Sequence, residues 1–171
     1  MMPRVLKNFN VIIEGRPMVG LAEELTLPPL ERKTDEYQAG GMLGPVEIDM
    51  GMTSLKLEFT LAEFNPDVLA GWGLGDASGL PVRFLGAAQS DGGTTATDAI
   101  EIAVRGRWKK IEQGSVKRGD RSKMKVEMPL TYYRYSRNGL TLIEIDLIAG
   151  KEIVNGIDRS AGVMQALGLA S

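Results

Sequence analysis

The stretch VEIDMGMTSLKLEFTL, residues 46–61, contains two alternations of apolar and polar side chains that are out of phase with each other. The apolar side chains occupy even-numbered positions over residues 46–52 and odd-numbered positions over residues 55–61. Because side chains leave a β-strand on alternate faces, each half predicts a strand with one apolar face. The change of phase between Gly51 and Ser54 predicts a bulge or a sharp bend at that point.

The segment that precedes this stretch predicts the other half of a hairpin. Residues 33–38 are polar on both faces, and residues 39–44, AGGMLG, are typical of a turn. Residues 46–61 together are much longer than a usual strand of about five or six residues. We therefore expect an arm, at about residues 31–60, that leaves the globular body.

The outer part of this arm has an apolar stripe and an acidic edge. The stripe contains Val46, Ile48, Met50 and Met52, and Glu47 and Asp49 alternate with it. Full burial of each apolar side chain would contribute about 1.5–3 kcal/mol, so the stripe needs a covering surface. Two interpretations are open: the arm folds back over its own domain, or other molecules cover it.

Further alternating segments predict a β-rich domain. They lie at residues 11–13, 82–84, 100–108, 124–132 and 143–147. Asn138-Gly139 between two such segments is a strong signal for a tight hairpin. The 21 glycines and 8 prolines, spread along the chain, also favour many turns over a helical bundle.

Two short helices are expected beside these strands. Asn65 is a good N-cap and Pro66 suits the first helical position, which predicts a helix at about residues 65–73. A second helix is expected at about residues 160–167. No linker or internal repeat divides the 171 residues, so we expect a single domain over residues 1–171.

The composition excludes several kinds of chemistry. The chain has no cysteine and no histidine, so it makes no disulfide, thiolate nucleophile, Cys/His zinc site or histidine-based acid–base pair. No nucleophile, base and orienting group occur together in a recognisable pattern. We therefore expect no catalytic residue, no metal site and no cofactor. We also expect no secretory signal and no membrane insertion, since the apolar run at residues 11–13 is too short.

The charge is unevenly distributed. Residues 105–125 contain nine basic and two acidic side chains, a net charge of +7, so the remaining residues carry −9 of the total of −2. This basic stretch has two interpretations, a nucleic-acid site or a solvated face that forms ion pairs between subunits. The second is favoured because the stretch lacks interleaved aromatic side chains that stack on bases, apart from Trp108, which falls on the apolar face.

Long runs of this sequence resemble one family. They are LTLPPL at 25–30, KTDEY at 33–37, AGGM at 39–42, PVEIDMG at 45–51, the opening MMPRVLKNFNVIIEG and the ending IEIDLIAGKEIVNGIDRSAGVMQALGL at 143–169. These runs, in this order, resemble the major tail tube protein of contractile-tailed bacteriophages. They are equally similar to the tube protein of R-type pyocins, which are headless relatives of such tails.

The resemblance implies a fold and an assembly. Members of the family are mainly β, with an antiparallel β-sandwich or half-barrel, a flanking α-helix and a long protruding β-hairpin. Six copies join into a ring with a continuous inner β-barrel, and the rings stack into a hollow tube. The implied partners are further copies of the chain, a tail sheath, and baseplate and tail-terminator proteins. DNA passes through the lumen without specific binding. The implied location is the virion, after assembly in the cytoplasm of the bacterial host.

The resemblance also suggests which residues meet other subunits. The expected hairpin contacts between subunits are Tyr37, Met42, Val46, Ile48, Met50 and Met52. A bore that lets a duplex slide should be acidic, because lysine and arginine hold phosphates. The candidates for the lumen lining or for charge pairing are Glu47, Asp49, Glu58 and Glu101.

Other functions stay open at this point. The chain could be the tube subunit of a headless tail-derived bacteriocin or of a related contractile injection or secretion apparatus. It could be a β-sandwich binding module that forms no polymer. An enzyme is the alternative with the least support in the sequence.

Overall fold

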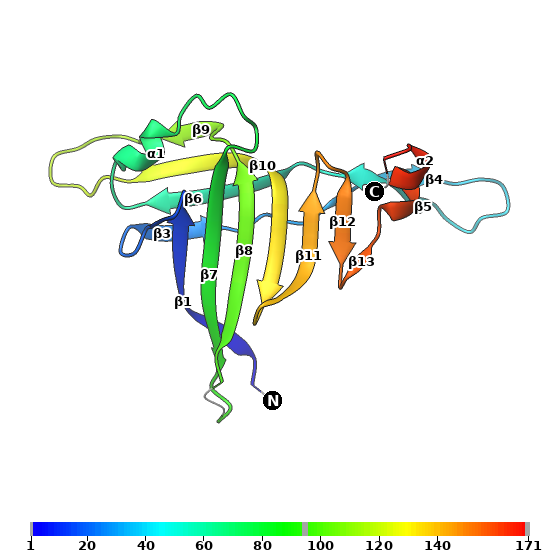
Figure 1. Cartoon of the computed structure of the whole chain (residues 1–171), viewed down its shortest axis with the longest axis horizontal. Helices are drawn as coiled ribbons and strands as arrows, with labels where there is room; N and C mark the ends of the chain where they lie inside the picture. Colours follow the sequence, from blue (N-terminus) through cyan, green and yellow to red (C-terminus); the bar gives the residue numbers. More distant parts are fainter. Residues whose placement is uncertain (1, 94–95, 170–171) are drawn as a thin grey trace.

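The computed structural model describes residues 2–93 and 96–169 and consists mainly of antiparallel strands (Figure 1). The elements in these residues are, in chain order, β1 (Arg4–Ile13), β2 (Arg16–Pro17), β3 (Ala22–Thr26), β4 (Arg32–Tyr37), β5 (Val46–Met52), β6 (Leu55–Leu61), α1 (Pro66–Ala70), β7 (Leu80–Ser90), β8 (Asp98–Gly106), β9 (Lys110–Glu112), β10 (Met124–Arg137), β11 (Leu140–Asp146), β12 (Lys151–Val154), β13 (Ile157–Asp158) and α2 (Ala161–Ala166). The mainly β, antiparallel fold expected from the sequence is confirmed.

The strands of the body form two layers that share β10. One layer is a long sheet with the order β13-β12-β11-β10-β8-β7-β1-β2. The first half of β10 pairs instead with β6 and β9, and β6 also pairs with β3. Because β10 is 14 residues long, it runs from one layer into the other. It thereby joins both layers around one core.

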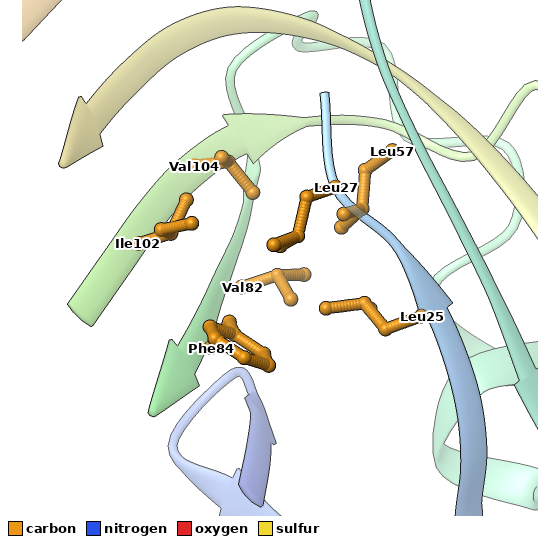
Figure 2. A pocket seen from close by; sticks show the side chains of 7 residues that line it. All are labelled: Leu25, Leu27, Leu57, Val82, Phe84, Ile102 and Val104. Carbon is orange, nitrogen blue, oxygen red and sulfur yellow. The ribbon is translucent and has the colours of Figure 1, made fainter. Parts of the chain in front are cut away.

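The core lies between these two layers. Alternate residues of β6 are buried, and their neighbours are exposed or half-buried. Figure 2 shows the core side chains of β3, β6, β7 and β8, together with Leu27 just after β3, pointing toward one another. Burial of alternate side chains removes apolar surface from water, which is the main stabilising term for such a sandwich. The polar side chains of each layer therefore face outward.

The arm separates from the body where the apolar phase changes. β5 ends at Met52 and β6 begins at Leu55, and β4 and β5 form a two-stranded sheet of their own. Gly51 has a φ of +111°, a conformation that side chains other than glycine rarely adopt. The arm spans residues 32–52, shorter than the expected 31–60, because β6 is part of the core.

The two helices lie near the positions that the sequence indicates but are short. The Asn65 side chain accepts hydrogen bonds from the backbone N–H groups of Asp67 and Val68, which caps α1. Val68 is the buried residue of α1, and its carbonyl accepts a hydrogen bond of 3.0 Å from Trp108 Nε1. At α2, Ser160 occupies the N-cap position but makes no capping bond; its hydroxyl donates to the Gly150 carbonyl at 2.7 Å.

The hairpin between β10 and β11 turns at Asn138 and Gly139, as the sequence predicts. Their φ angles are +51° and +80°. Positive φ at both central residues is the signature of a type I′ turn, whose twist matches that of the flanking strands.

Candidate assembly interface

One face of the arm is apolar and exposed. In the register of β4 with β5, Tyr37 lies opposite Val46 and Asp35 lies opposite Ile48. Residues directly opposite each other in an antiparallel pair project on the same side. Tyr37, Val46 and Ile48 therefore share a face with one carboxylate, that of Asp35, and the exposed fractions of the three apolar side chains are 52%, 49% and 45%. Met50 is 59% exposed. The isolated subunit does not cover these side chains, so the arm does not fold back over its own domain.

Two other methionines expected at subunit contacts are less exposed. Both Met42 and Met52 are half-buried. The Met42 sulfur accepts a hydrogen bond from the Ala39 backbone N–H at 3.2 Å, which holds it inside the turn. Met52 packs against the core of the body. The arm's exposed apolar face is thus formed by Tyr37, Val46, Ile48 and Met50.

The opposite face of the arm is acidic. Glu36 lies opposite Glu47, and Thr34 lies opposite Asp49. The Thr34 hydroxyl donates a long hydrogen bond of 3.4 Å to Glu47. Glu47 and Asp49 are candidates for the lumen lining or for charge pairing, and the register adds Glu36 beside them. The sequence pattern alone did not indicate Glu36, because its place depends on how β4 aligns with β5.

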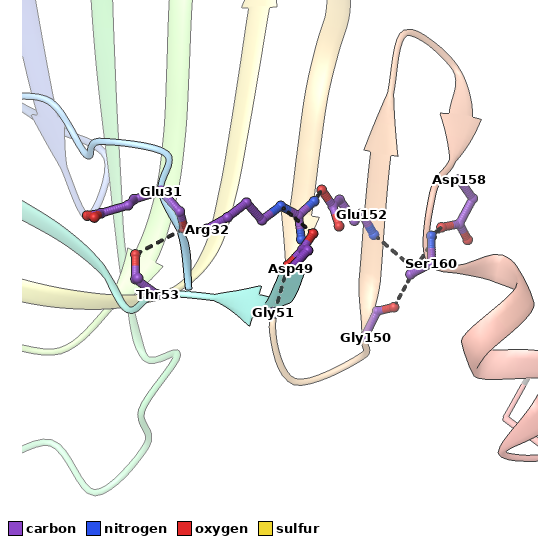
Figure 3. A network of polar contacts seen from close by, with 9 residues as sticks. All are labelled: Glu31, Arg32, Asp49, Gly51, Thr53, Gly150, Glu152, Asp158 and Ser160. Carbon is purple, nitrogen blue, oxygen red and sulfur yellow. Dashed lines mark hydrogen bonds and ion pairs between the residues drawn. The ribbon is translucent and has the colours of Figure 1, made fainter. Parts of the chain in front are cut away.

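The root of the arm is fixed to the body by polar contacts (Figure 3). Arg32 forms an ion pair with Glu152 of β12, and its Nε lies 3.6 Å from an Asp49 oxygen. The Glu152 backbone N–H donates to the Ser160 hydroxyl at 3.2 Å. Thr53 donates to the Glu31 carbonyl through both its backbone N–H and its hydroxyl, at 3.1 Å each. Arg32 therefore links the root of the arm to β12, and the Thr53 hydrogen bonds join the ends of the two chain segments at that root.

Glu58 and Glu101, the other candidates for the lumen, lie on different layers. Glu58 projects from the outer face of β6, 3.2 Å from Lys56 Nζ. Glu101 projects from the outer face of β8, where it accepts hydrogen bonds from Arg83 at 3.0 Å and from Arg134 at 3.2 Å. The two carboxylates face away from the shared core on opposite sides, so the structure does not bring them together.

The long sheet has two open edges. The segment of β1 from Arg4 to Val11 pairs with β7 on one side, while β2 pairs only with Ile12 and Ile13. At the other end, β13 pairs only with Ile153 and Val154 of β12. Unpaired backbone N–H and C=O groups on an edge strand are ready to pair with another chain. Sequence reasoning missed these edges because a single sequence does not give the strand order.

Metal-binding clusters and membrane-spanning helices are absent from the part of the chain that the structure describes. Over residues 2–93 and 96–169, no group of three or more Asp, Glu, His or Cys side chains is arranged to hold a metal ion. None of the helices in these ranges is both long enough and apolar enough to cross a membrane.

Comparison with protein families gives one match over nearly the whole chain. The model of the family described as "Phage tail tube protein FII" matches residues 3–168. The chain is 39% identical over 173 residues to the tail tube protein of Escherichia phage P2, which covers 98% of this chain and 99% of that protein. It is 33% identical over 156 residues to the major tail tube protein of Serratia phage KSP20, covering 85% and 84% of the two chains.

The fold is also similar to solved structures. One is a chain from the sheath-tube complex of the extracellular contractile injection system PVC in its extended state, with a TM-score of 0.57 and 12% identity. The match covers 78% of this chain and 91% of that chain. A second is a chain from the sheath/tube terminator of the same system, with a TM-score of 0.58 and 12% identity over 80% and 98% of the two chains. At this identity the likeness concerns the fold alone.

Proposed function

Because this chain belongs to the phage tail tube protein FII family and is a structural subunit of a tail tube, we propose that it polymerises as stacked hexameric rings. The tube is the inner tube of a contractile phage tail and conducts DNA into the bacterial host. It is assembled in the host cytoplasm and becomes part of the virion. The family is one of structural proteins, and we assign the chain no catalytic role.

The exposed apolar face of the arm carries this proposal. Tyr37, Val46, Ile48 and Met50 are each about half exposed, whereas the alternate side chains of β6 are at most 2% exposed. When another copy covers the apolar face of the arm, this apolar surface is removed from water, and that removal favours association of the two copies. The hexameric ring supplies that copy, so the hairpin contacts expected from the sequence become contacts between neighbouring subunits.

The open edges of the long sheet support the ring. In the proposed assembly, the β1 edge of one copy lies beside the β12–β13 edge of the next. Pairing there satisfies the edge groups of both copies and continues the sheet into a closed barrel. Closure removes the exposed edges that otherwise favour aggregation of β-proteins.

The stacking of rings requires a different kind of contact. Head-to-tail contacts join two unlike surfaces and generate an open filament, as a tube requires. The outer surface of this filament meets the tail sheath, and its ends meet the baseplate and the tail terminator. The proposed partners of the tube are therefore the tail sheath, the baseplate and the tail terminator.

The proposed bore does not bind DNA tightly. Free lysine and arginine side chains hold phosphates. On the outer face of β8, Glu101 accepts hydrogen bonds from both Arg83 and Arg134, so these guanidinium groups are partly neutralised. The three side chains together carry a net charge of +1, so weak binding of a duplex at this point depends on the pairing with Glu101 and not on an excess of acidic side chains.

Charged substitutions on the apolar face of the arm test the proposal. We expect Ile48→Asp and Met50→Asp to abolish rings and tubes in negative-stain images, because each places a carboxylate in the contact that must become dry. Both variants should remain folded subunits by circular dichroism and should elute as monomers in size-exclusion chromatography with light scattering.

The matched control is Val19→Asp, which changes an apolar side chain that is 74% exposed and lies away from the arm. It should still form tubes. Normal tube yield from both arm variants would contradict the assigned interface, and a native chain that stays monomeric at all concentrations would contradict the polymer.

Both curated relatives described above come from phages. Capsid genes beside the sheath and baseplate genes would support a complete phage, and a tail cluster without capsid genes would support a headless bacteriocin.

A further inference from the structure

We propose that the acidic face of the arm docks on the basic loop of a neighbouring copy, where the basic loop is residues 113–123 between β9 and β10. This inference rests on the proposed polymer and names one of its contacts. It pairs two exposed segments of opposite charge.

The basic loop carries cations that the subunit itself does not neutralise. It contains Lys117, Arg118, Arg121 and Lys123 against the single acid Asp120, a net charge of +3, and all its residues are exposed. Arg121 and Lys123 each lie 3.5 Å from a Glu23 oxygen at the base of the loop. Lys117 and Arg118, near the tip, form no ion pair with any residue in the described ranges.

The outer arm carries the matching anions. Residues 34–48 contain no basic residue and three acids, a net charge of −3: Glu36 and Glu47 lie on the acidic face, and Asp35, opposite Ile48, lies on the other face. None of the three carboxylates forms an ion pair within residues 2–93 and 96–169. Glu36 and Glu47 lie directly opposite each other in the hairpin. Like charges in that position destabilise a strand pair, so a cation from outside the subunit would stabilise the arm.

The two segments cannot meet within one copy. Figure 1 shows the basic loop and the tip of the arm at opposite ends of the longest axis of the subunit. In Figure 1 the basic loop lies on the β1 side of the long sheet and the arm on the β12–β13 side, so the two segments meet between copies that follow one another around the proposed ring, a heterologous contact. Complementary charge then helps to fix which surfaces meet and in which register.

The composition of the basic loop favours a protein partner over nucleic acid. Residues 113–123 contain no aromatic side chain that could stack on a base. Trp108, the aromatic residue nearest in sequence before the loop, is only 6% exposed, and its Nε1 donates a hydrogen bond to the Val68 carbonyl oxygen. Its ring is therefore not free to stack on a base.

Charge reversal on each side, followed by recombination, tests the contact. The arm variant is Glu36→Lys with Glu47→Lys, and the loop variant is Lys117→Glu with Arg118→Glu. The control Glu24→Lys with Glu63→Lys makes the same change of charge at two exposed sites outside both segments. Tube yield is measured by sedimentation and negative stain over a series of protein concentrations.

Each variant alone should raise the concentration required for assembly by about tenfold or more, because two attractive contacts become repulsive. The control should assemble like the native chain. An equimolar mixture of the arm and loop variants should regain assembly, since the reversed arm of one meets the reversed loop of the other and the native arm meets the native loop.

Native assembly from both variants would overturn the inference while leaving the polymer intact. Failure of the mixture to regain assembly would also overturn it, because the charges of the arm and those of the loop would then not contact each other. A loop variant that forms tubes normally but loses a salt-sensitive gel shift with duplex DNA would assign the loop to nucleic acid instead. Absence of tubes from the native chain would overturn both this inference and the proposed function.

Discussion

At the scale of single residues, Asp98 connects three strands of the long sheet. It lies at the start of β8 and is 7% exposed. Its carboxylate accepts hydrogen bonds from Arg137 Nε and Asn138 Nδ2, both at 3.1 Å, and forms an ion pair with Arg4 of β1. Hydrogen bonds from Arg137 and Asn138, together with Arg4, lower the pKa of Asp98 from 3.8 to about 2.

This pKa predicts an acid dependence of stability. A carboxylate whose pKa is lower in the folded state stabilises the fold above its unfolded pKa of 3.8 and loses that effect as pH falls through about 2. We expect Asp98→Asn to have a lower melting temperature than the native chain at about pH 5, with a difference that shrinks by about pH 2.

The matched control for this prediction is Asp91→Asn, since Asp91 has a side chain 68% exposed and one surface ion pair, with Lys7. A surface pair contributes little, so its substitution should change the melting temperature little at any pH. A constant difference between Asp98→Asn and the native chain from pH 5 to pH 2 would count against the assigned role.

At the scale of elements, the arm depends on contacts at its root more than on its own two strands. An isolated two-stranded hairpin is at best marginally stable in water. Arg32 connects β4 to Glu152 of β12 and lies near Asp49 of β5. These contacts, with the Thr53 bonds to Glu31, set the direction of the arm before any partner binds.

We predict that Arg32→Ala loosens the arm without unfolding the body. Amide hydrogen exchange over residues 34–48 should become faster than in the native subunit. The free energy of unfolding should change by less than about 1 kcal/mol, since the ion pair is partly exposed. The control Lys33→Ala removes a neighbouring charge that has no such contact with β12, and it should leave exchange unchanged. Equal exchange in native and Arg32→Ala subunits would show that Arg32 does not fix the arm.

At the scale of the whole molecule, the long sheet ends at β1 and β2 on one side and at β13 on the other, and the proposed ring joins these edges into a barrel. The outer face of the long sheet, with Glu101, would then line the bore, and the outer face of β6, with Glu58, would point away from it. The chain has no cysteine, so single cysteines can report on each face.

We predict that Glu101→Cys in assembled, sheath-free tubes reacts with a small maleimide but not with a large polymer-linked maleimide, whereas Glu58→Cys reacts with both. In free subunits both cysteines should react with both reagents, which serves as the control. The reverse pattern in tubes would place the outer face of β6 toward the bore.

The sequence by itself determined most of the local structure and the identity of the family. Period-two alternation predicted the strands, the phase change near Gly51 predicted the break between β5 and β6, and Asn138-Gly139 predicted the turn. These features depend on neighbouring residues, so they can be read from one chain. The apolar stripe at Val46, Ile48 and Met50 was evident for the same reason.

Tertiary structure alone decided what depends on residues far apart in the chain. The ion pair of Arg32 with Glu152, the opposition of Glu36 and Glu47, and the separation of Glu58 from Glu101 follow from strand order and register. Pattern reasoning also extended the arm to residue 60, because alternation looks the same in an arm and in a core strand. Burial of β6 against the second layer settled that boundary, since only packing distinguishes an apolar side chain covered by its own fold from one left for another copy.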